Sequence, residues 1–369
     1  MPPHNNESDE LASNGSSSPA PSMSTYGRYL GTYASTPRAL LPGIYTPVPT
    51  FFHATTQHLD LPTLQSHVLR LCASGITGIV TQGSNGEACH LSHSERRLVT
   101  ATARATLDAS SYAHLPVLVG CGAQSTQETI ELCNDALISG GDYALILPPS
   151  YYKSLYTRES LRDFFLQVAD ESPIPVLIYN FPGAASGTDM DSELIEELAR
   201  HENIVGVKLT CGNTGKLARV AAGTRNFLTM SGSCDFTLQA LVVGGDGVIG
   251  GLSNIAPHAC VEIYRLYEAG RLEAARKIQA VVARGDWVCI KGGVVATKAG
   301  LMAYFQYGGY GRKPLPKPTA EKEKEMKEEL AELMLLEEFL MGGSKDVHFE
   351  RLKEFPQLVE LERLLTLEG

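Results

Sequence analysis

The stretch "IVGVKLTCGN", from Ile204 to Asn213, begins with the apolar and β-branched residues of a buried strand. Its fifth residue, however, is Lys208. A lysine at this place is either a strand-end residue whose amine reaches solvent or pairs with Glu87, or a buried amine with a chemical task. Which interpretation holds depends on the position of this strand in the fold.

Strand-like runs of the same kind recur from Gly43 onward, and helical stretches separate them. The helical stretches, such as "SHSERRLVTATARATL" and "DSELIEELARH", open on a Ser or Asp cap, and several close on Gly. Alternation of this kind with continuous apolar strands indicates a parallel sheet that is buried on both faces. The eight runs begin near Ile44, Thr77, Val117, Tyr143, Val176, Ile204, Phe227 and Gly247.

Eight strand–helix units in about 220 residues predict an α/β fold of the (β/α)8 TIM-barrel type. An open doubly wound sheet is the alternative, although no GxGxxG follows the first run. We expect the barrel to span residues 41–256, a C-terminal helical domain to span 257–342, and a helical appendage to span 343–369. Residues 1–40 are rich in Ser, Pro, Asn and Gly, which predicts a disordered tail.

The composition excludes several classes of protein. The net charge is −10 and no basic stripe stands out, which argues against nucleic acid or an anionic membrane surface as a partner. The longest apolar runs have the length of a strand, short of the roughly 20 residues of a membrane-spanning helix. The eight cysteines form no CxxC pair, which predicts buried free thiols in a reducing compartment rather than a disulfide framework or a zinc knuckle.

The N-terminal tail bears on the compartment. It has no apolar segment of the kind found in secretory signals. Glu7, Asp9 and Glu10 argue against a mitochondrial presequence, whereas Arg28 and Arg38 favour one. We expect a cytoplasmic location, with the mitochondrion as the alternative.

In a (β/α)8 barrel the active site lies at the C-terminal ends of the strands. Lys208 and Thr210 stand at the end of the sixth run, and Tyr179 stands at the end of the fifth. Burial disfavours a charged ammonium, and a neutral amine can attack a carbonyl carbon to form a Schiff base. A phenol beside the resulting iminium can transfer protons, although a rim tyrosine with a solvated hydroxyl is the alternative for Tyr179.

Two glycine-rich segments follow other strands. In Gly83–Glu87 ("GSNGE"), the backbone amides and the Ser84 hydroxyl are suited to hold a carboxylate; the alternative is a tight turn. "GGDGVIGG", near the eighth run, has no accompanying basic residue, so we expect close backbone packing there rather than phosphate binding. His90 and His93 have no further ligand-like cluster beside them, so we expect neither a metal nor a cofactor.

The motifs "GSNGEACHLSHSER", "PPSYYKS", "YNFPG", "VGVKLT" and "GDGVIGGLSN" occur in this order between Leu41 and Pro316. In these motifs the chain resembles the dihydrodipicolinate synthase / N-acetylneuraminate lyase family of Schiff-base aldolases. The resemblance implies a (β/α)8 barrel followed by a C-terminal helical domain, assembled as a homotetramer or at least a dimer. It also implies a small 2-oxo acid as the substrate.

The resemblance assigns roles to residues. Lys208 would form the imine with pyruvate or a pyruvate-yielding acid, and Tyr179 would be the proton shuttle. Tyr152, in preference to Tyr151, would match the tyrosine that reaches into a neighbouring subunit's site. The residues that would bind the substrate are Gly83, Ser84, Asn85, Thr210, Gly232 and Ile249.

Departures from the family pattern bear on the substrate. Dihydrodipicolinate synthases carry an arginine shortly after the "YN.P" motif, and the stretch Gly183–Gly187 has none. A synthase-like activity is therefore a minor alternative, as is a barrel that binds a 2-oxo acid without turnover. "YNFPGAASG" and "VKLTCGNTGKLARVAA" resemble the L-threo-3-deoxy-hexulosonate aldolases, our first choice, whereas "QGSNGE" and "SYYKS" resemble the 4-hydroxy-2-oxoglutarate aldolases, our second.

Overall fold

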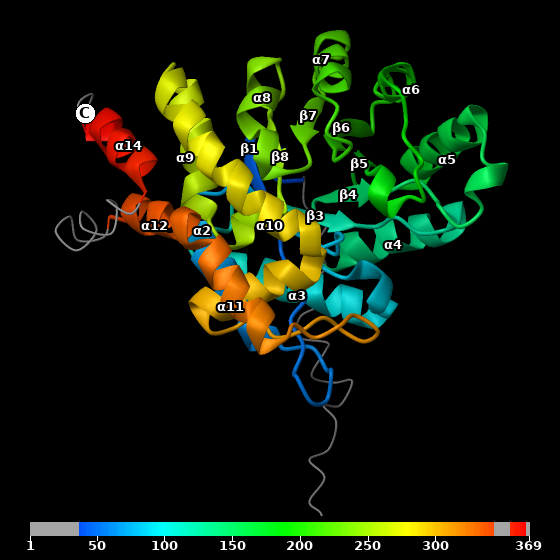
Figure 1. The fold of residues 1–369 in the computed structure, drawn as a ribbon. Helices are drawn as coiled ribbons and strands as arrows, with labels where there is room; N and C mark the ends of the chain where they lie inside the picture. The colour runs from blue at the N-terminus through cyan, green and yellow to red at the C-terminus, as the bar shows by residue number, and fades with distance from the viewer. Residues whose placement is uncertain (1–36, 343–354, 367–369) are drawn as a thin grey trace, which may run out of the picture.

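The computed structural model describes residues 37–342 and 355–366. The remaining residues of the predicted tail and of the predicted appendage lie outside this part of the chain. At its centre is a closed parallel barrel in which each strand pairs with the next and β8 pairs with β1 (Figure 1). Closure confirms the predicted (β/α)8 barrel, and the open-sheet alternative is wrong. The strands are β1 (Gly43–Pro47), β2 (Gly78–Thr81), β3 (Val117–Gly120), β4 (Tyr143–Ile146), β5 (Val176–Asn180), β6 (Ile204–Leu209), β7 (Leu228–Ser231) and β8 (Gly247–Ile249).

Closure depends on a close approach of backbones between β8 and β1. Gly43 and Gly247 are register partners across this seam. Gly247 has a φ of 144°, and a Cβ there would lie 2.0 Å from the carbonyl oxygen of Gly43. Only glycine fits such a position, which agrees with the expected backbone packing of the "GGDGVIGG" segment.

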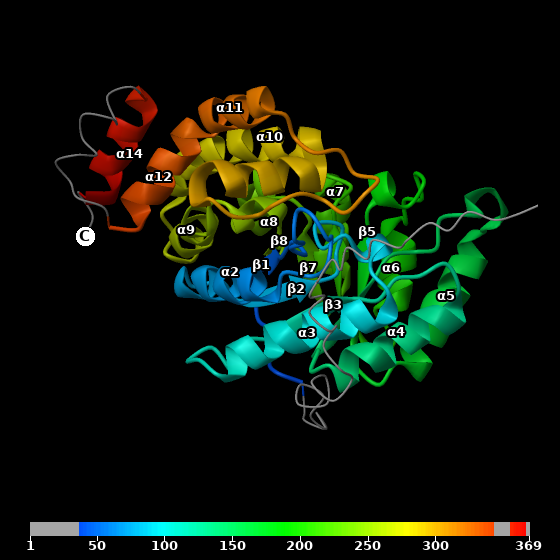
Figure 2. The ribbon, with the colours of Figure 1, turned by 90° about the horizontal axis from the view of Figure 1, so that it is seen from below.

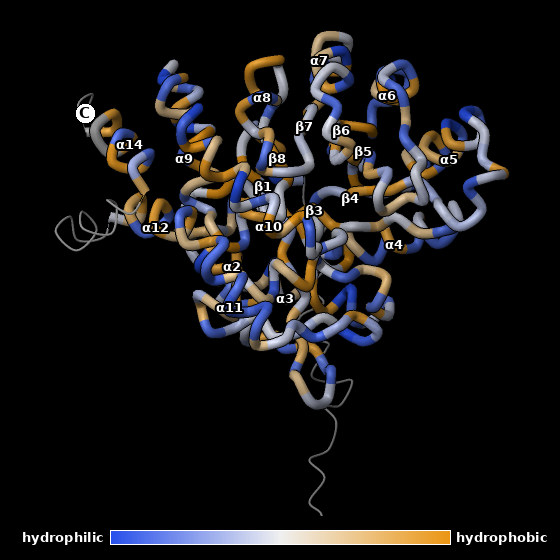
Figure 3. Tube along the Cα trace, viewed as in Figure 1, coloured by the Kyte–Doolittle hydropathy of each residue, from blue (hydrophilic) through white to orange (hydrophobic). Residues whose placement is uncertain are grey.

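Helices surround the barrel, and polar caps begin most of them as predicted. Ser92 forms a capping box with Glu95 at the start of α3, and the side chains of Ser125 and Asp191 cap α4 and α6. Each of these helices presents one apolar face to the sheet, and the surrounding helices alternate between hydrophobic and hydrophilic colours in Figure 3. They are α2 (Leu61–Ala73), α3 (His93–Asp108), α4 (Thr126–Ile138), α5 (Arg158–Glu171), α6 (Ser192–Leu198), α7 (Thr214–Gly223) and α8 (Thr237–Val242).

A second, smaller core fills the barrel interior. Its side chains point inward from the strands, and they form a packed cluster rather than a pore. Two of them, Tyr179 and Ile249, were singled out from the sequence. The buried members are Tyr45, Val80, Leu118, Tyr143, Leu145, Leu177, Tyr179, Met230 and Ile249.

The chain after the barrel is helical, as predicted. Figure 2 shows α10, α11 and α12 together on one side of the barrel, with α14 beyond α12. α10 bends at Gly293, where φ is 58°. The helices are α9 (Pro257–Glu268), α10 (Leu272–Phe305), α11 (Ala320–Glu329), α12 (Ala331–Leu340) and α14 (Pro356–Thr366).

α10 departs from the expectation that no segment has membrane-spanning length. By length and composition alone it is long and apolar enough to cross a membrane. The apolar runs in the sequence did not reveal the length of this apolar helix, because single charged residues interrupt them. However, 44% of its most apolar window is buried within the protein, and a core helix passes the same test.

A buried ion pair joins α10 to the loop that follows β2. Lys298 on α10 donates to Glu87 Oε1 at 2.5 Å, and only 1% of either side chain is exposed. The backbone N–H of Arg312 donates to Glu87 Oε2 at 2.8 Å. The helices after the barrel therefore hold the Gly83–Glu87 loop, and Glu87 is not the partner of Lys208 that the sequence had left open.

We predict that Lys298→Met destabilises the protein by about 3–5 kcal/mol, because it leaves the buried Glu87 carboxylate without its cation. Lys291→Met is the matched control on the same helix, because Lys291 pairs with Glu329 at the surface. It should cost no more than about 1 kcal/mol. Denaturant unfolding of both variants at one protein concentration measures the difference. Equal losses of unfolding free energy in the two variants would show that the buried pair contributes no more to stability than the surface pair.

Candidate active site

Lys208 and Tyr179 lie side by side at the C-terminal ends of two adjacent strands. They are register partners in the pairing of β6 with β5, so both side chains point to the same face of the sheet. Lys208 is 4% exposed and Tyr179 is 3% exposed. The Lys208 amine nitrogen lies over the tyrosine ring, 4.2 Å from its centroid. Lys208 therefore does not extend to solvent as a surface lysine would.

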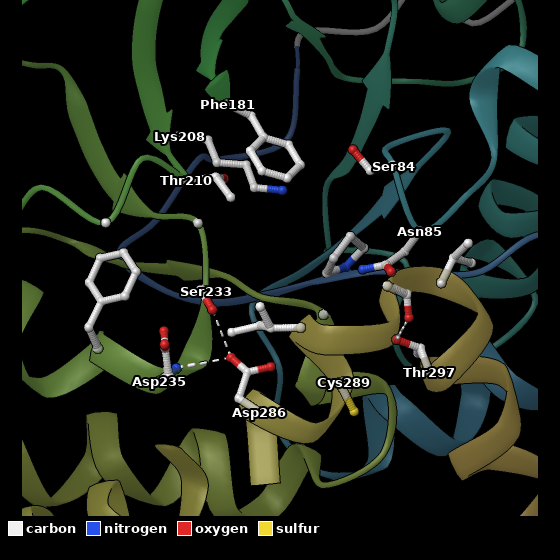
Figure 4. Close-up of a pocket in the computed structure, with 18 of the residues that line it drawn as sticks. Ser84, Asn85, Phe181, Lys208, Thr210, Ser233, Asp235, Asp286, Cys289 and Thr297 are labelled. Carbon is white, nitrogen blue, oxygen red and sulfur yellow. Dashed lines mark hydrogen bonds between the residues drawn. The ribbon is translucent and has the colours of Figure 1, made fainter. Parts of the chain in front are cut away.

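Both residues line a cavity of about 490 Å³. The ends of β5, β6 and β7, the loop after β2 and helix α10 supply its walls. Figure 4 shows the Lys208 amine extending into this space, with Phe181 beside it. The ring of Phe181 stacks on that of Tyr179, with centroids 5.8 Å apart and 23° between the planes. This aromatic wall restricts the orientation of the phenol.

The loop after β2 brings Ser84 and Asn85 to the same cavity. The Ser84 and Tyr179 hydroxyl oxygens are 3.4 Å apart. Asn85 packs so closely against Gly251 that a Cβ at Gly251 would lie 2.6 Å from the Asn85 side-chain nitrogen. Gly83 lines a neighbouring cavity of about 310 Å³ instead, to which Ser84 and Tyr179 also contribute.

Thr210 and Gly232 form another part of the wall. A Cβ at Gly232 would lie 1.8 Å from the Thr210 hydroxyl oxygen, so the residue that follows β7 must be glycine for Thr210 to keep its place. Among the described residues, the Thr210 hydroxyl oxygen is buried without a hydrogen-bond partner. Buried polar atoms normally have partners, so this hydroxyl is available to a bound molecule.

Besides Gly83, two residues proposed from the resemblance do not lie at the surface of the 490 Å³ cavity in a single chain. Ile249 belongs to the packed interior cluster and is not exposed to the cavity. Tyr152 is 59% exposed, packs edge-on against Tyr151 with centroids 4.9 Å apart, and lies outside the cavity wall. Within one chain, therefore, neither side chain touches the space in front of Lys208.

Helix α10 contributes residues that the sequence reasoning did not identify. Asp286 is 2% exposed and lines the cavity. Its Oδ2 accepts hydrogen bonds from the Ser233 hydroxyl at 2.8 Å and from the backbone N–H of Asp235 at 3.0 Å (Figure 4). Burial raises the pKa of Asp286 to about 6. The sequence signal that could have identified Asp286 is a single acidic residue within the apolar stretch "GDWVCIKGG".

His90 and His93 take part in ion-pair contacts rather than in a cluster of ligands. The ring of His90 lies 3.0 Å from Glu87 Oε2, and that of His93 lies 3.3 Å from Asp135. Within residues 37–342 and 355–366, no three His, Cys, Asp or Glu side chains gather as a metal site would require.

The fold and the site together define a class of protein: a (β/α)8 barrel with a buried lysine at the end of β6 and a tyrosine beside it on β5. Comparison with known proteins agrees with this class. The sequence model of the dihydrodipicolinate synthetase family matches residues 40–336. The chain belongs to this family, as the motifs predicted.

The alignments with curated relatives cover nearly the whole length of each relative. "Probable 4-hydroxy-2-oxoglutarate aldolase, mitochondrial" of Emericella nidulans is 54% identical over 301 residues, which cover 81% of this chain and 97% of the relative. "L-threo-3-deoxy-hexylosonate aldolase" of Hypocrea jecorina is 44% identical over 313 residues, 82% of this chain and 99% of the relative. Both names are those of aldolases, which belong to the lyases.

Solved structures share the fold. A dihydrodipicolinate synthase family protein from Coccidioides immitis is 35% identical, has a TM-score of 0.74, and aligns with 83% of this chain and 100% of its own. A prophage protein of the dihydrodipicolinic acid synthase family from E. coli K12, solved in complex with pyruvate, is 28% identical with a TM-score of 0.74. Its alignment covers 80% of this chain and 99% of that protein.

We predict that Asp286→Asn changes how stability depends on pH. The pKa of Asp286 is about 6 in the folded protein and 3.8 for a free aspartate, so the folded state retains this proton longer. The wild type should lose on the order of 3 kcal/mol of unfolding free energy relative to the variant as the pH rises from about 4 to about 6. Above about pH 6 the difference should stay constant.

Denaturant unfolding of both proteins at a series of pH values measures this difference. Parallel profiles across the whole range would contradict the raised pKa of Asp286.

Proposed function

We propose that this protein is a class I, Schiff-base aldolase that cleaves a 2-oxo-3-deoxy sugar acid and releases pyruvate. The observation that carries the proposal is the pairing of Lys208 with Tyr179 in one register position, both buried and both lining one cavity. An amine and a phenol at this spacing are the two groups that imine-based carbon–carbon cleavage requires.

The proposed reaction begins when the Lys208 amine attacks C2 of the substrate. Tyr179 gives its phenolic proton to the carbinolamine hydroxyl, which leaves as water and gives an iminium. The Tyr179 phenolate then accepts the proton of the C4 hydroxyl, the C3–C4 bond breaks, and its electron pair neutralises the iminium to an enamine while the aldehyde forms. Protonation of the enamine at C3 and addition of water release pyruvate and restore the Lys208 amine. No metal or cofactor takes part in any step.

The remaining residues would orient the substrate. We propose that the Ser84 hydroxyl, Asn85 and the amides of the loop that begins at Gly83 bind the C1 carboxylate. The Thr210 hydroxyl, which has no partner among the described residues, supports a contact to the substrate. Gly232 leaves room for that threonine, and Ile249 supports the floor of the pocket from within the barrel.

We propose L-threo-3-deoxy-hexulosonate as the substrate, which would give pyruvate and L-glyceraldehyde. The names of the relatives from Hypocrea jecorina and Aspergillus niger support it. 4-Hydroxy-2-oxoglutarate, which would give glyoxylate, is the second candidate, because the relative with 54% identity bears that name. The lack of an arginine in Gly183–Gly187 makes a synthase-like reaction a weaker alternative, and the intact pair of Lys208 and Tyr179 argues against a barrel without turnover.

We further propose a homo-oligomer, a tetramer or a dimer, in which Tyr152 reaches a neighbouring site. The exposure of Tyr151 and Tyr152, at 78% and 59%, supports a buried role in an assembly. We keep residues 41–256, 257–342 and 343–369 as the proposed barrel, helical domain and appendage. Sedimentation of the full chain as a monomer at assay concentrations would contradict the assembly.

The compartment is a separate proposal. We propose the cytoplasm, with the mitochondrion as an alternative that the printed names of two relatives support. Imaging of the full chain, with a fluorescent protein fused after Gly369, distinguishes the two. Fluorescence confined to mitochondria would contradict the cytoplasmic assignment.

We predict that incubation with pyruvate followed by borohydride reduction yields one covalent adduct, located on Lys208. Reduction fixes the imine as a secondary amine, and peptide mass spectrometry locates it. Lys216 is the matched control, because it is a second buried lysine that pairs with Asp189. An adduct on Lys216, or none at all, would contradict the mechanism.

Tyr179→Phe should still form the Lys208 adduct but should lose about 10²–10⁴-fold in kcat, because it lacks the group that moves the proton. Tyr143→Phe is the matched control, since Tyr143 also lies in the barrel interior but donates to the carbonyl of Arg38. Pyruvate release by both variants measures the effect. Undiminished turnover in Tyr179→Phe would remove the shuttle role.

A further inference from the structure

The charged groups of the cavity are distributed unevenly. Among the described residues that line it, Lys208 is the one cation, and Asp235 and Asp286 are the two carboxylates. Figure 4 places Lys208 on one side of the cavity and both aspartates on the other. The space in front of the amine is therefore bounded by an acidic wall, which has no arginine or lysine of its own within the described lining.

Hydrogen bonds hold this wall in place. Asp286 accepts from Ser233 and from the backbone N–H of Asp235, which fixes the turn after β7 against α10. The Oδ1 atom of Asp235 is buried and has no hydrogen-bond partner within the described part of the chain. A carboxylate oxygen accepts hydrogen bonds, so this atom is suited to a ligand that donates an O–H.

The two candidate substrates differ in what they bring to this wall. In the proposed mechanism, C2 is bound to Lys208 and the C1 carboxylate lies at the Ser84 loop. The part of the substrate beyond C4 then faces the remaining walls. In 4-hydroxy-2-oxoglutarate this part is a second carboxylate, whereas in L-threo-3-deoxy-hexulosonate it carries neutral hydroxyls. A carboxylate beside two others is repelled, while hydroxyls can donate to them.

We propose that Asp286, together with the Asp235 turn that it fixes, is the determinant of substrate specificity: it selects a neutral, hydroxylated aldehyde half and rejects one that bears a carboxylate. This inference rests on the proposed aldolase function. It assigns a role in substrate choice to the helix after the barrel, because Asp286 lies on α10. If Asp286 only held α10 against the turn after β7, replacing it would leave substrate preference unchanged.

The test compares kcat/KM for pyruvate release from L-threo-3-deoxy-hexulosonate and from 4-hydroxy-2-oxoglutarate. The full-length wild type and the Asp286→Asn and Asp235→Asn variants are assayed at about pH 8, above the pKa of Asp286. Asp163→Asn is the matched control, because Asp163 is an exposed acid on α5. Borohydride trapping of pyruvate on Lys208 is measured in every variant, which reports on the imine step alone.

We expect the wild type to prefer the sugar acid, and Asp286→Asn to reduce that preference by about tenfold or more, with trapping intact. Asp235→Asn should act in the same direction, and it carries the test if Asp286→Asn fails to fold. Two results would overturn the inference: a wild-type preference for 4-hydroxy-2-oxoglutarate, or an unchanged ratio of kcat/KM in both variants, whether or not activity is lost equally on both substrates. Failure of wild-type Lys208 to trap pyruvate would instead overturn the aldolase function itself.

Discussion

The pairing of β5 with β6 is the constraint on which the site depends. It makes Tyr179 and Lys208 register partners, and a shift of one residue would turn one of them to the opposite face of the sheet. Barrel closure, through the glycine contact between β1 and β8, then buries both side chains against the same cavity. Register and closure together therefore place the amine and the phenol of the proposed Schiff-base reaction side by side.

Helix α10 connects stability with function. Lys298 binds the buried Glu87 carboxylate at the end of the loop that presents Ser84, and Asp286 fixes the turn after β7. The two contacts lie on opposite sides of the bend at Gly293. The helices that follow the barrel therefore complete the cavity, and a (β/α)8 barrel without them would lack both the support of the loop and the acidic wall.

The sequence predicted most of the fold because its signals are local. Apolar runs located the start of each strand to within one residue, and Ser or Asp caps located helix starts. Lys208 and Tyr179 followed from their places at strand ends. Asp286 could not be found in this way, because it follows Lys208 by nearly 80 residues and reaches the cavity only through tertiary packing of α10. The role proposed for Tyr152 would require a second chain, which one sequence does not place.

The central claim is that Lys208 is the nucleophile and that the surrounding residues hold a 2-oxo acid against it. A crystal structure of the protein soaked with pyruvate tests this most directly. The account predicts continuous density from the Lys208 amine nitrogen to C2 of pyruvate, with the carboxylate against Ser84 and the Tyr179 hydroxyl beside the imine. Pyruvate bound elsewhere, or in this cavity without a covalent bond to Lys208, would contradict it.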